Sequence, residues 1–172
     1  MPTIRLFLKG PLSQWVRSDF IINGNKYNCC EQWMMAEKAR LFKDDDVHQK
    51  IMAAGPDNPA FNARIWIDYP REQKKLGREV KGFIKEEWEK VAQAVVYRGN
   101  HAKFSQNPEL WAILDATGDD ILAEANPRDP IWGIGLAADD PRALDKTTWQ
   151  GKNWLGEALM KAREQIRKDK KT

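Results

Sequence analysis

Cysteine is scarce in this chain of 172 residues, which has two, Cys29 and Cys30, next to each other. Neighbouring cysteines rarely bond to each other, and no second pair is present to complete a zinc site. The absence of a disulfide framework is typical of a protein from a reducing compartment. We therefore expect two free thiols and no metal centre.

Long hydrophobic runs are also missing. No apolar segment approaches the length of a membrane span, and the N-terminus has no signal-peptide pattern. Hydrophobic residues make up 42% and charged residues 31% of the chain, which is the profile of an ordinary soluble domain. We expect an intracellular protein, cytoplasmic or, in a eukaryotic cell, nuclear, with no membrane partner.

An excess of charge of one sign is nearly absent. There are 28 Lys and Arg against 25 Asp and Glu, so the net charge of +3 is too small to indicate nucleic-acid binding by itself. Residues 167–172 form a basic tail, which is typical of a solvated helix end. The length fits one domain over residues 1–172 with a real core.

Tryptophan, in contrast, is abundant, with eight residues. One interpretation is a core built with large rings. The other is that one or two of the rings stack on a flat base or sugar.

Helical patterns dominate the chain. The spacing of apolar residues and the capping signals predict helices over residues 28–42, 47–54, 70–76, 85–102, 108–114 and 153–168. Short strands are expected over 3–8 and 120–125, and Asn23-Gly24 predicts a small hairpin over 20–27. The consecutive acids at 44–46 are interpreted as helix caps.

The segment Asn28–Phe42 carries the sharpest functional signal. On a helical wheel its apolar residues form one broad face, and Glu31 and Lys38 lie within about 20° of each other in the middle of it. Burying a charge is costly unless the charge is paired or functional. Two interpretations remain open: a capping box of Asn28 and Glu31 with a snorkelling Lys38, or a functional site.

The segment Asn126–Gly135 places two prolines and two glycines around Trp132, which excludes regular structure. Gly133 and Gly135 allow close backbone approach or positive φ. With the carboxylate of Asp129, this loop either lines a small-molecule pocket or makes a tight connection over a buried ring.

Several short motifs occur in a fixed order. They are Leu12-Ser13, Glu31 with Lys38-Ala39, Leu76-Gly77-Arg78, Lys103-Phe104 with Asn107, Thr117-Gly118-Asp119, Glu124, Asp129 with Trp132–Gly135, and Gly151-Lys152-Asn153 continuing to Arg163. In this order they resemble the NADAR family, also called YbiA-like, over about residues 7–163. The family's usual Leu-Ser-Asn reads Leu-Ser-Gln here, at Gln14, and the segment 58–69 is longer than in many members.

The resemblance implies a mainly helical single-domain fold with a few short β-strands. It implies an N-glycosidase that breaks the bond from ribose C1 to an amino nitrogen, without a metal or redox cofactor. Two substrate classes follow: ADP-ribose attached to guanine in DNA or RNA, or phosphoribosylamino-pyrimidine and pyrimidinone intermediates of riboflavin synthesis. A non-catalytic ADP-ribose or nucleotide reader is the alternative from another class. The sequence leaves the oligomeric state open.

Cleavage of a ribosyl C–N bond builds positive charge at C1, which a carboxylate can stabilise while it also transfers protons. Glu31 is the first candidate, with Asp129 as its partner. Lys38 is the candidate for an amine that attacks C1 and forms a Schiff base. We expect Asp129 and Trp132 to line the same pocket as Glu31.

Other residues are expected to bind the substrate. The candidates for phosphate contacts are Arg78, Lys103 and Arg163. The candidates for stacking on a base are Trp88 and Trp132. The remaining candidates are Ser13, Trp15, Asn107, Glu124, Gly133, Gly135 and Asn153.

Overall fold

The computed structural model describes residues 2–61 and 63–172. The chain forms two compact units. The terminal unit combines the segment up to Ser13 with Phe104–Thr172, and the central unit is Gln14–Lys103. Each is described below by itself.

Helices account for most of the regular structure, as the sequence predicted. The helices are α1 (Cys30–Leu41), α2 (Asp45–Ala53), α3 (Asp68–Arg78), α4 (Lys85–Gln106), α5 (Pro108–Asp115) and α6 (Trp154–Lys170). The strands are β1 (Ile4–Phe7), β2 (Phe20–Ile22), β3 (Asn25–Tyr27) and β4 (Ile121–Glu124). Two short 3₁₀ helices, η1 (Pro141–Leu144) and η2 (Lys146–Thr148), lie between β4 and α6.

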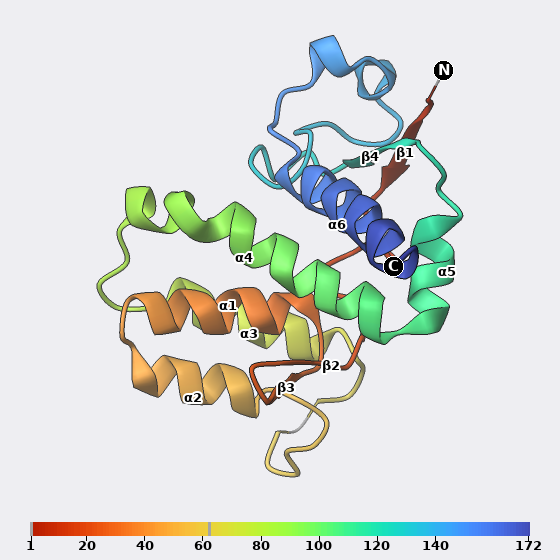
Figure 1. The fold of residues 1–172 in the computed structure, drawn as a ribbon. Coiled ribbons are helices and arrows are strands. Elements are labelled where there is room, and N and C mark those ends of the chain that lie inside the picture. The colour runs from red at the N-terminus through yellow and green to blue at the C-terminus, as the bar shows by residue number, and fades with distance from the viewer. Residues whose placement is uncertain (1, 62) are drawn as a thin grey trace. The chain divides into compact units, whose positions relative to one another are not determined.

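Helix α1 is the centre of the central unit. It packs against α2 and α3 and lies beside α4 (Figure 1). Seven consecutive residues, 30–36, are buried, so the first turns of α1 are covered on all sides rather than along one apolar face. Leu41, which a helical wheel places on the apolar face of this segment, is 37% exposed, so that face is not buried along its whole length.

Two glycines on neighbouring helices make room for the large side chains of α1. A Cβ at Gly99 in α4 would overlap the ring of Trp33, and a Cβ at Gly77 in α3 would overlap the sulfur of Met35. The indole Nε1 of Trp33 donates to the carbonyl of Val95 over 2.7 Å. Close approach of α3 and α4 to α1 therefore depends on positions that carry no side chain.

Local signals set the other elements of the central unit. Asn23 and Gly24 have φ angles of 51° and 80°, which is the primed turn expected for the β2–β3 hairpin. Asp44 is the N-cap of α2, and its carboxylate accepts from the backbone N–H of Val47. Its other oxygen accepts from the backbone N–H of Lys81 over 2.9 Å, which holds the α3–α4 connection.

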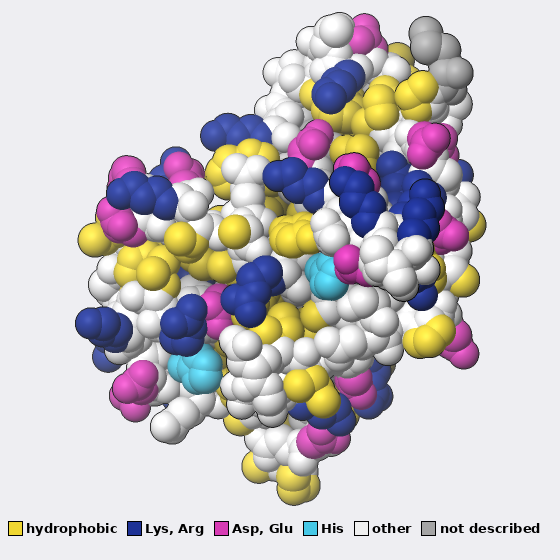
Figure 2. Space-filling model, in the orientation of Figure 1, with side chains coloured by type: hydrophobic (Ala, Val, Ile, Leu, Met, Phe, Trp, Pro, Cys, Tyr) yellow, Lys and Arg dark blue, Asp and Glu magenta, His cyan; other side chains and the backbone are white. Residues whose placement is uncertain are grey.

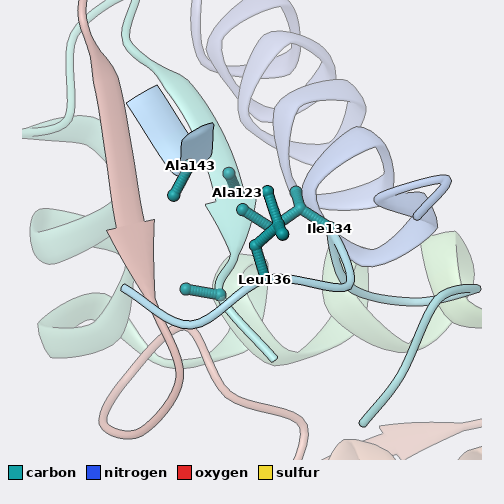
Figure 3. Packing of buried hydrophobic residues seen from close by; sticks show 5 residues of the cluster. Ala123, Ile134, Leu136 and Ala143 are labelled. Atoms are coloured by element: carbon teal, nitrogen blue, oxygen red, sulfur yellow. The ribbon is translucent and has the colours of Figure 1, made fainter. Parts of the chain in front are cut away.

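The terminal unit is built on a parallel strand pair. β1 pairs with β4 from Ile4 opposite Ile121 to Phe7 opposite Glu124, and α6 packs on β4. The buried side chains beside this pair form a small cluster (Figure 3), whose members are Ala123, Ala125, Ile134, Leu136 and Ala143.

Three predicted boundaries need correction. α3 begins at Asp68, so Pro70 is its third residue instead of its first, and α4 continues to Gln106. The basic end is not simply a solvated tail, because α6 continues to Lys170 and Arg167 donates to the carboxylate of Asp115 over 2.7 Å.

The surface carries mixed charge. On the face drawn in Figure 2, Lys and Arg side chains lie among Asp and Glu side chains. Among the helices that the structure describes, none has the length and apolar character needed to span a membrane.

Candidate active site

The carboxylate of Glu31 originates from the buried first turn of α1. Its side chain is 4% exposed, and its backbone N–H donates to the carbonyl of Gln14 over 3.1 Å. The positive end of the helix dipole favours a carboxylate at this position. Burial and this position together make Glu31 the acidic group most suited to chemistry in the central unit.

The capping-box interpretation of Glu31 is wrong. α1 begins at Cys30 with Cys29 as its N-cap, and the side chain at the third helical position is Gln32, whose Oε1 accepts from the backbone N–H of Asn28 over 2.8 Å. The side chain of Asn28 instead donates to the carbonyl of Ala54 and accepts from Gln73. Burial of Glu31 is therefore not explained by capping.

Lys38 lies two turns further along α1 and is half-buried. Its amine is 4.4 Å from the centre of the Phe83 ring, and that ring packs edge-on against Phe42 at 5.4 Å. The pKa of Lys38 lies below its ordinary value, because burial and the nearby charge of Arg78 outweigh the opposing effect of the Glu31 carboxylate. Of the two opposing effects expected from the sequence, burial is thus the stronger, and the pKa of Lys38 is lowered.

Arg78, Trp88 and Trp15 are expected binding residues that lie in the central unit. Arg78 is the exposed last residue of α3, and Trp88 is buried in the first turns of α4. Trp15 is half-buried, and its carbonyl accepts from the indole of Trp66 over 2.7 Å. Arg78 lies close enough to Lys38 for its charge to lower the pKa of that amine, and the binding roles of all three residues stay predictions.

Lys103 is fully buried, with 0% of its surface exposed. Burial lowers its pKa to about 8, and the nearby thiols of Cys30 and Cys29 offset only part of this effect. A phosphate reaches this amine only if the covering side chains move. The expected phosphate contact of Lys103 stays a prediction.

Both cysteines are free, as the sequence predicted, and both are buried. The thiol of Cys29 donates to the side-chain oxygen of Gln73, and that of Cys30 lies 3.7 Å from the oxygen of Asn100. Burial raises the pKa of Cys30 to about 11 and that of Cys29 further. At neutral pH neither cysteine supplies a thiolate nucleophile.

In the terminal unit, Asp129 fixes the irregular loop that contains Trp132. One carboxylate oxygen of Asp129 accepts from the backbone N–H groups of Ile131 and Trp132 over 3.0 and 2.9 Å. The Trp132 ring lies edge-on to Trp154, with their centres 5.6 Å apart. Asp129 therefore holds the loop in shape, a role that the sequence reasoning missed.

The two glycines of this loop have the backbone properties expected of them. A Cβ at Gly133 would lie 2.9 Å from the carbonyl oxygen of Glu124 and 3.1 Å from its carboxylate. Gly135 has a φ of 71°, which other residues rarely adopt. The chain here passes close to Glu124, another expected binding residue.

Asn153 and Arg163 form bonds within the terminal unit that indicate structural roles. Asn153, with a φ of 53°, accepts from the backbone N–H of Glu124 and donates to the carbonyl of Leu122. Arg163 is buried and donates to the hydroxyl of Thr117 over 2.7 Å and to a backbone carbonyl. Their predicted contacts with substrate stay predictions.

The other two candidates of the terminal unit stand at chain turns. Ser13 donates through its backbone to the carbonyl of Gly10 over 2.9 Å, and Asn107 is the N-cap residue of α5, just before Pro108.

Within residues 2–61 and 63–172, no three His, Cys, Asp or Glu side chains gather as a metal site would require.

Known proteins resemble this chain over most of its length. N-glycosidase R617 of Acanthamoeba polyphaga mimivirus is 40% identical over 158 residues, which cover 89% of this chain and 85% of that protein. Protein irg-1 of Caenorhabditis elegans is 38% identical over 82% of this chain and 61% of its own length. The NMR structure of the Escherichia coli protein YbiA matches with a TM-score of 0.73 and 27% identity, covering 99% of this chain and 89% of that chain.

The fold and these relatives define an N-glycosidase, a hydrolase of N-glycosyl bonds. The NADAR domain model matches residues 7–167, and the chain belongs to the NADAR family.

Proposed function

We propose that this N-glycosidase removes ADP-ribose from ADP-ribosylated guanine in nucleic acid, by hydrolysing the bond between ribose C1 and the amino nitrogen of guanine. The observation that carries the proposal is the arrangement on α1: the buried Glu31 carboxylate and the half-buried Lys38 amine of lowered pKa, with Arg78 beside them.

Glu31 transfers the protons in this reaction. As the bond to C1 breaks, its electron pair goes to the guanine nitrogen, which takes a proton from Glu31. The resulting carboxylate stabilises positive charge at C1 and then accepts a proton from the attacking water.

Lys38 is suited to act as the nucleophile. Its neutral amine forms a bond to C1 while the bond to the guanine nitrogen breaks. The sugar ring opens as the amine loses a proton and the ring oxygen gains one, which gives a Schiff base. Water then adds to C1 and releases both ADP-ribose and the amine.

Basic side chains on α3 support a substrate with several phosphates. The exposed basic residues of this helix are Arg71, Lys74, Lys75 and Arg78. ADP-ribose carries a pyrophosphate, and nucleic acid adds further phosphates, which arginine binds well. Replacement of Arg78 by Ala should raise KM more than it lowers kcat, since a phosphate remote from C1 is bound equally throughout the reaction.

The deciding experiment incubates the protein with ADP-ribosylated guanine DNA and measures free ADP-ribose. Glu31→Gln should abolish release, whereas Glu37→Gln on the same helix should not, because Glu37 pairs with Arg40. Borohydride added during turnover should trap a sugar adduct on Lys38. Failure to trap, with Lys38→Ala still active, would remove the Schiff base and leave Glu31 as the acting group.

In a parallel reaction, the protein is incubated with the phosphoribosylamino intermediates of riboflavin synthesis in place of the DNA. Release of their base without release of ADP-ribose from DNA would overturn the proposed substrate and keep the reaction class.

A further inference from the structure

A buried glutamine lies directly beside the first turn of α1. Gln14 is 8% exposed, and its backbone carbonyl accepts the N–H of Glu31 over 3.1 Å. Gln14 is also the position at which the Leu-Ser-Asn motif of the family reads Leu-Ser-Gln. Its side chain has no part in the reaction described above.

The hydrogen bonds of Asn100 determine how the Gln14 amide is oriented. Asn100 Nδ2 donates to the carbonyl of Val96 over 2.9 Å, and Asn100 Oδ1 faces the thiol of Cys30. These two partners identify the nitrogen and the oxygen of Asn100. The atom of Gln14 that lies 2.9 Å from Asn100 Nδ2 must therefore be its acceptor, Oε1.

With Oε1 turned to Asn100, the Nε2 group of Gln14 is buried and has no hydrogen-bond partner in the described part of the chain. A buried donor without a partner is costly, and native proteins retain few of them. Gln73, a buried glutamine of the same unit, has partners for both ends of its amide. It is 0% exposed, its nitrogen donates to Asn28 and to the carbonyl of Ala54, and its oxygen accepts from Cys29. An acceptor atom supplied by a ligand would give the Nε2 group of Gln14 its missing hydrogen-bond partner.

We infer that Gln14 is a substrate-binding residue whose Nε2 donates to the oxygen of the ribose 2-hydroxyl, next to the bond that breaks. The inference rests on the proposed function. The backbone of Gln14 is hydrogen-bonded to the backbone of Glu31, the residue proposed to act at C1, and C2 is the neighbouring carbon. Hydrogen bonds to a 2-hydroxyl strengthen as positive charge develops at C1, so Gln14 contributes mainly to the transition state.

The experiment compares wild type and Gln14→Met on two substrates: ADP-ribosylated guanine DNA and its analogue without the ribose 2-hydroxyl. On the complete substrate, kcat should fall roughly ten- to a hundredfold, the effect of losing one such hydrogen bond, with a smaller change in KM. On the analogue, the same substitution should change kcat less than about threefold, because the partner oxygen is already missing. Equal losses on both substrates, or no loss on the complete one, would overturn the inference.

Thermal unfolding gives a second measurement that does not depend on the analogue. Gln14→Met removes a buried donor without a partner together with one bond accepted from Asn100, so the two effects offset each other and the midpoint should change little, whereas Gln73→Met loses three bonds and should lower it by several degrees or more. A drop for Gln14→Met as large as that for Gln73→Met would assign Gln14 a structural role and overturn the inference. If wild type does not act on ADP-ribosylated guanine, the proposed function fails instead, and the kinetic comparison moves to the phosphoribosylamino substrate, which carries the same hydroxyl.

Discussion

Two lysines of the central unit have pKa values shifted in the same direction for the same main reason, with different consequences. Burial lowers the pKa of both Lys38 and Lys103. Lys38 is half-buried beside Arg78, where a neutral amine can react. Lys103 is enclosed, so its titration affects folding.

The pH dependence of catalysis should reflect the protonation state of the Lys38 amine. If the neutral amine attacks C1, kcat/KM rises with pH along a limb whose apparent pKa lies below the ordinary lysine value of 10.5. Arg78→Ala removes a positive charge that lowers this pKa, so the limb should move to higher pH. Profiles of wild type and Arg78→Ala that superimpose would contradict this. Arg71→Ala is the matched control, since Arg71 pairs with Asp68.

The stability of the protein should depend on pH through Lys103. Its pKa is about 8 in the folded state and near 10.5 when unfolded. Below pH 8 both states hold the proton, and between pH 8 and 10.5 the folded state releases it first, so stability rises with pH through this window. The buried thiols of Cys29 and Cys30 lower stability as pH rises, because burial raises their pKa values and the unfolded state releases these protons first.

Comparison with Lys103→Met isolates this contribution. From pH 7 to 10.5, the free energy of unfolding of wild type should gain up to about 3 kcal/mol relative to the variant, as expected when folding lowers the pKa of the amine from 10.5 to about 8. Denaturant titrations at several pH values measure the difference. A difference that is constant with pH would show that Lys103 titrates normally.

At the scale of elements, the sequence predicted what local signals determine. Asn23-Gly24 specified the hairpin, and Asp44 specified the start of α2. The all-round burial of α1 could not be predicted, because it depends on glycines that lie far along the chain in other helices. The charges of Glu31 and Lys38 still pointed to α1 as the candidate functional helix, because a charged side chain within an apolar pattern is a signal that needs no tertiary information.

Gly99→Ala tests the packing of α4 on α1. The added methyl group would lie 3.0 Å from Trp33 Nε1 and overlap the ring, so the protein should lose about 1–3 kcal/mol of stability despite the better helix propensity of alanine. Chemical denaturation measures the loss. Trp33→Phe, which supplies space, should reduce the cost of the alanine in a double-mutant cycle. Additive losses would argue against contact between the two positions.

Substitution of Asn153 tests how much its hydrogen bonds and backbone conformation stabilise the junction of β4 and α6. Asn153→Ala removes the bonds to Leu122 and Glu124 and places alanine at a φ of 53°, so it should cost about 2–4 kcal/mol. Asn153→Gly removes the same bonds without the backbone strain and should be less destabilising by about 1 kcal/mol. Equal stability of the two variants would assign the whole cost to the hydrogen bonds.

At the scale of the whole molecule, the mainly helical NADAR fold was predicted from motifs spread along the chain and is confirmed. Which strands pair was not predicted, since β1 and β4 are far apart in sequence and each is too short to indicate a partner. Organisation as one domain stays a prediction. The shared pocket of Glu31 with Asp129 and Trp132 also stays one, because these residues belong to different units.

The β1–β4 pairing has a consequence for biosynthesis. β1 leaves the ribosome before β4, because its partner is made about 117 residues later. At about 5–20 residues per second, the nascent strand waits on the order of ten seconds with its hydrogen-bonding edge open. Gln14–Lys103 is synthesised in full during that interval. Translation pauses upstream of β4 should therefore prolong exposure of this edge, and chaperones that bind extended apolar segments should have time to bind Ile4–Phe7.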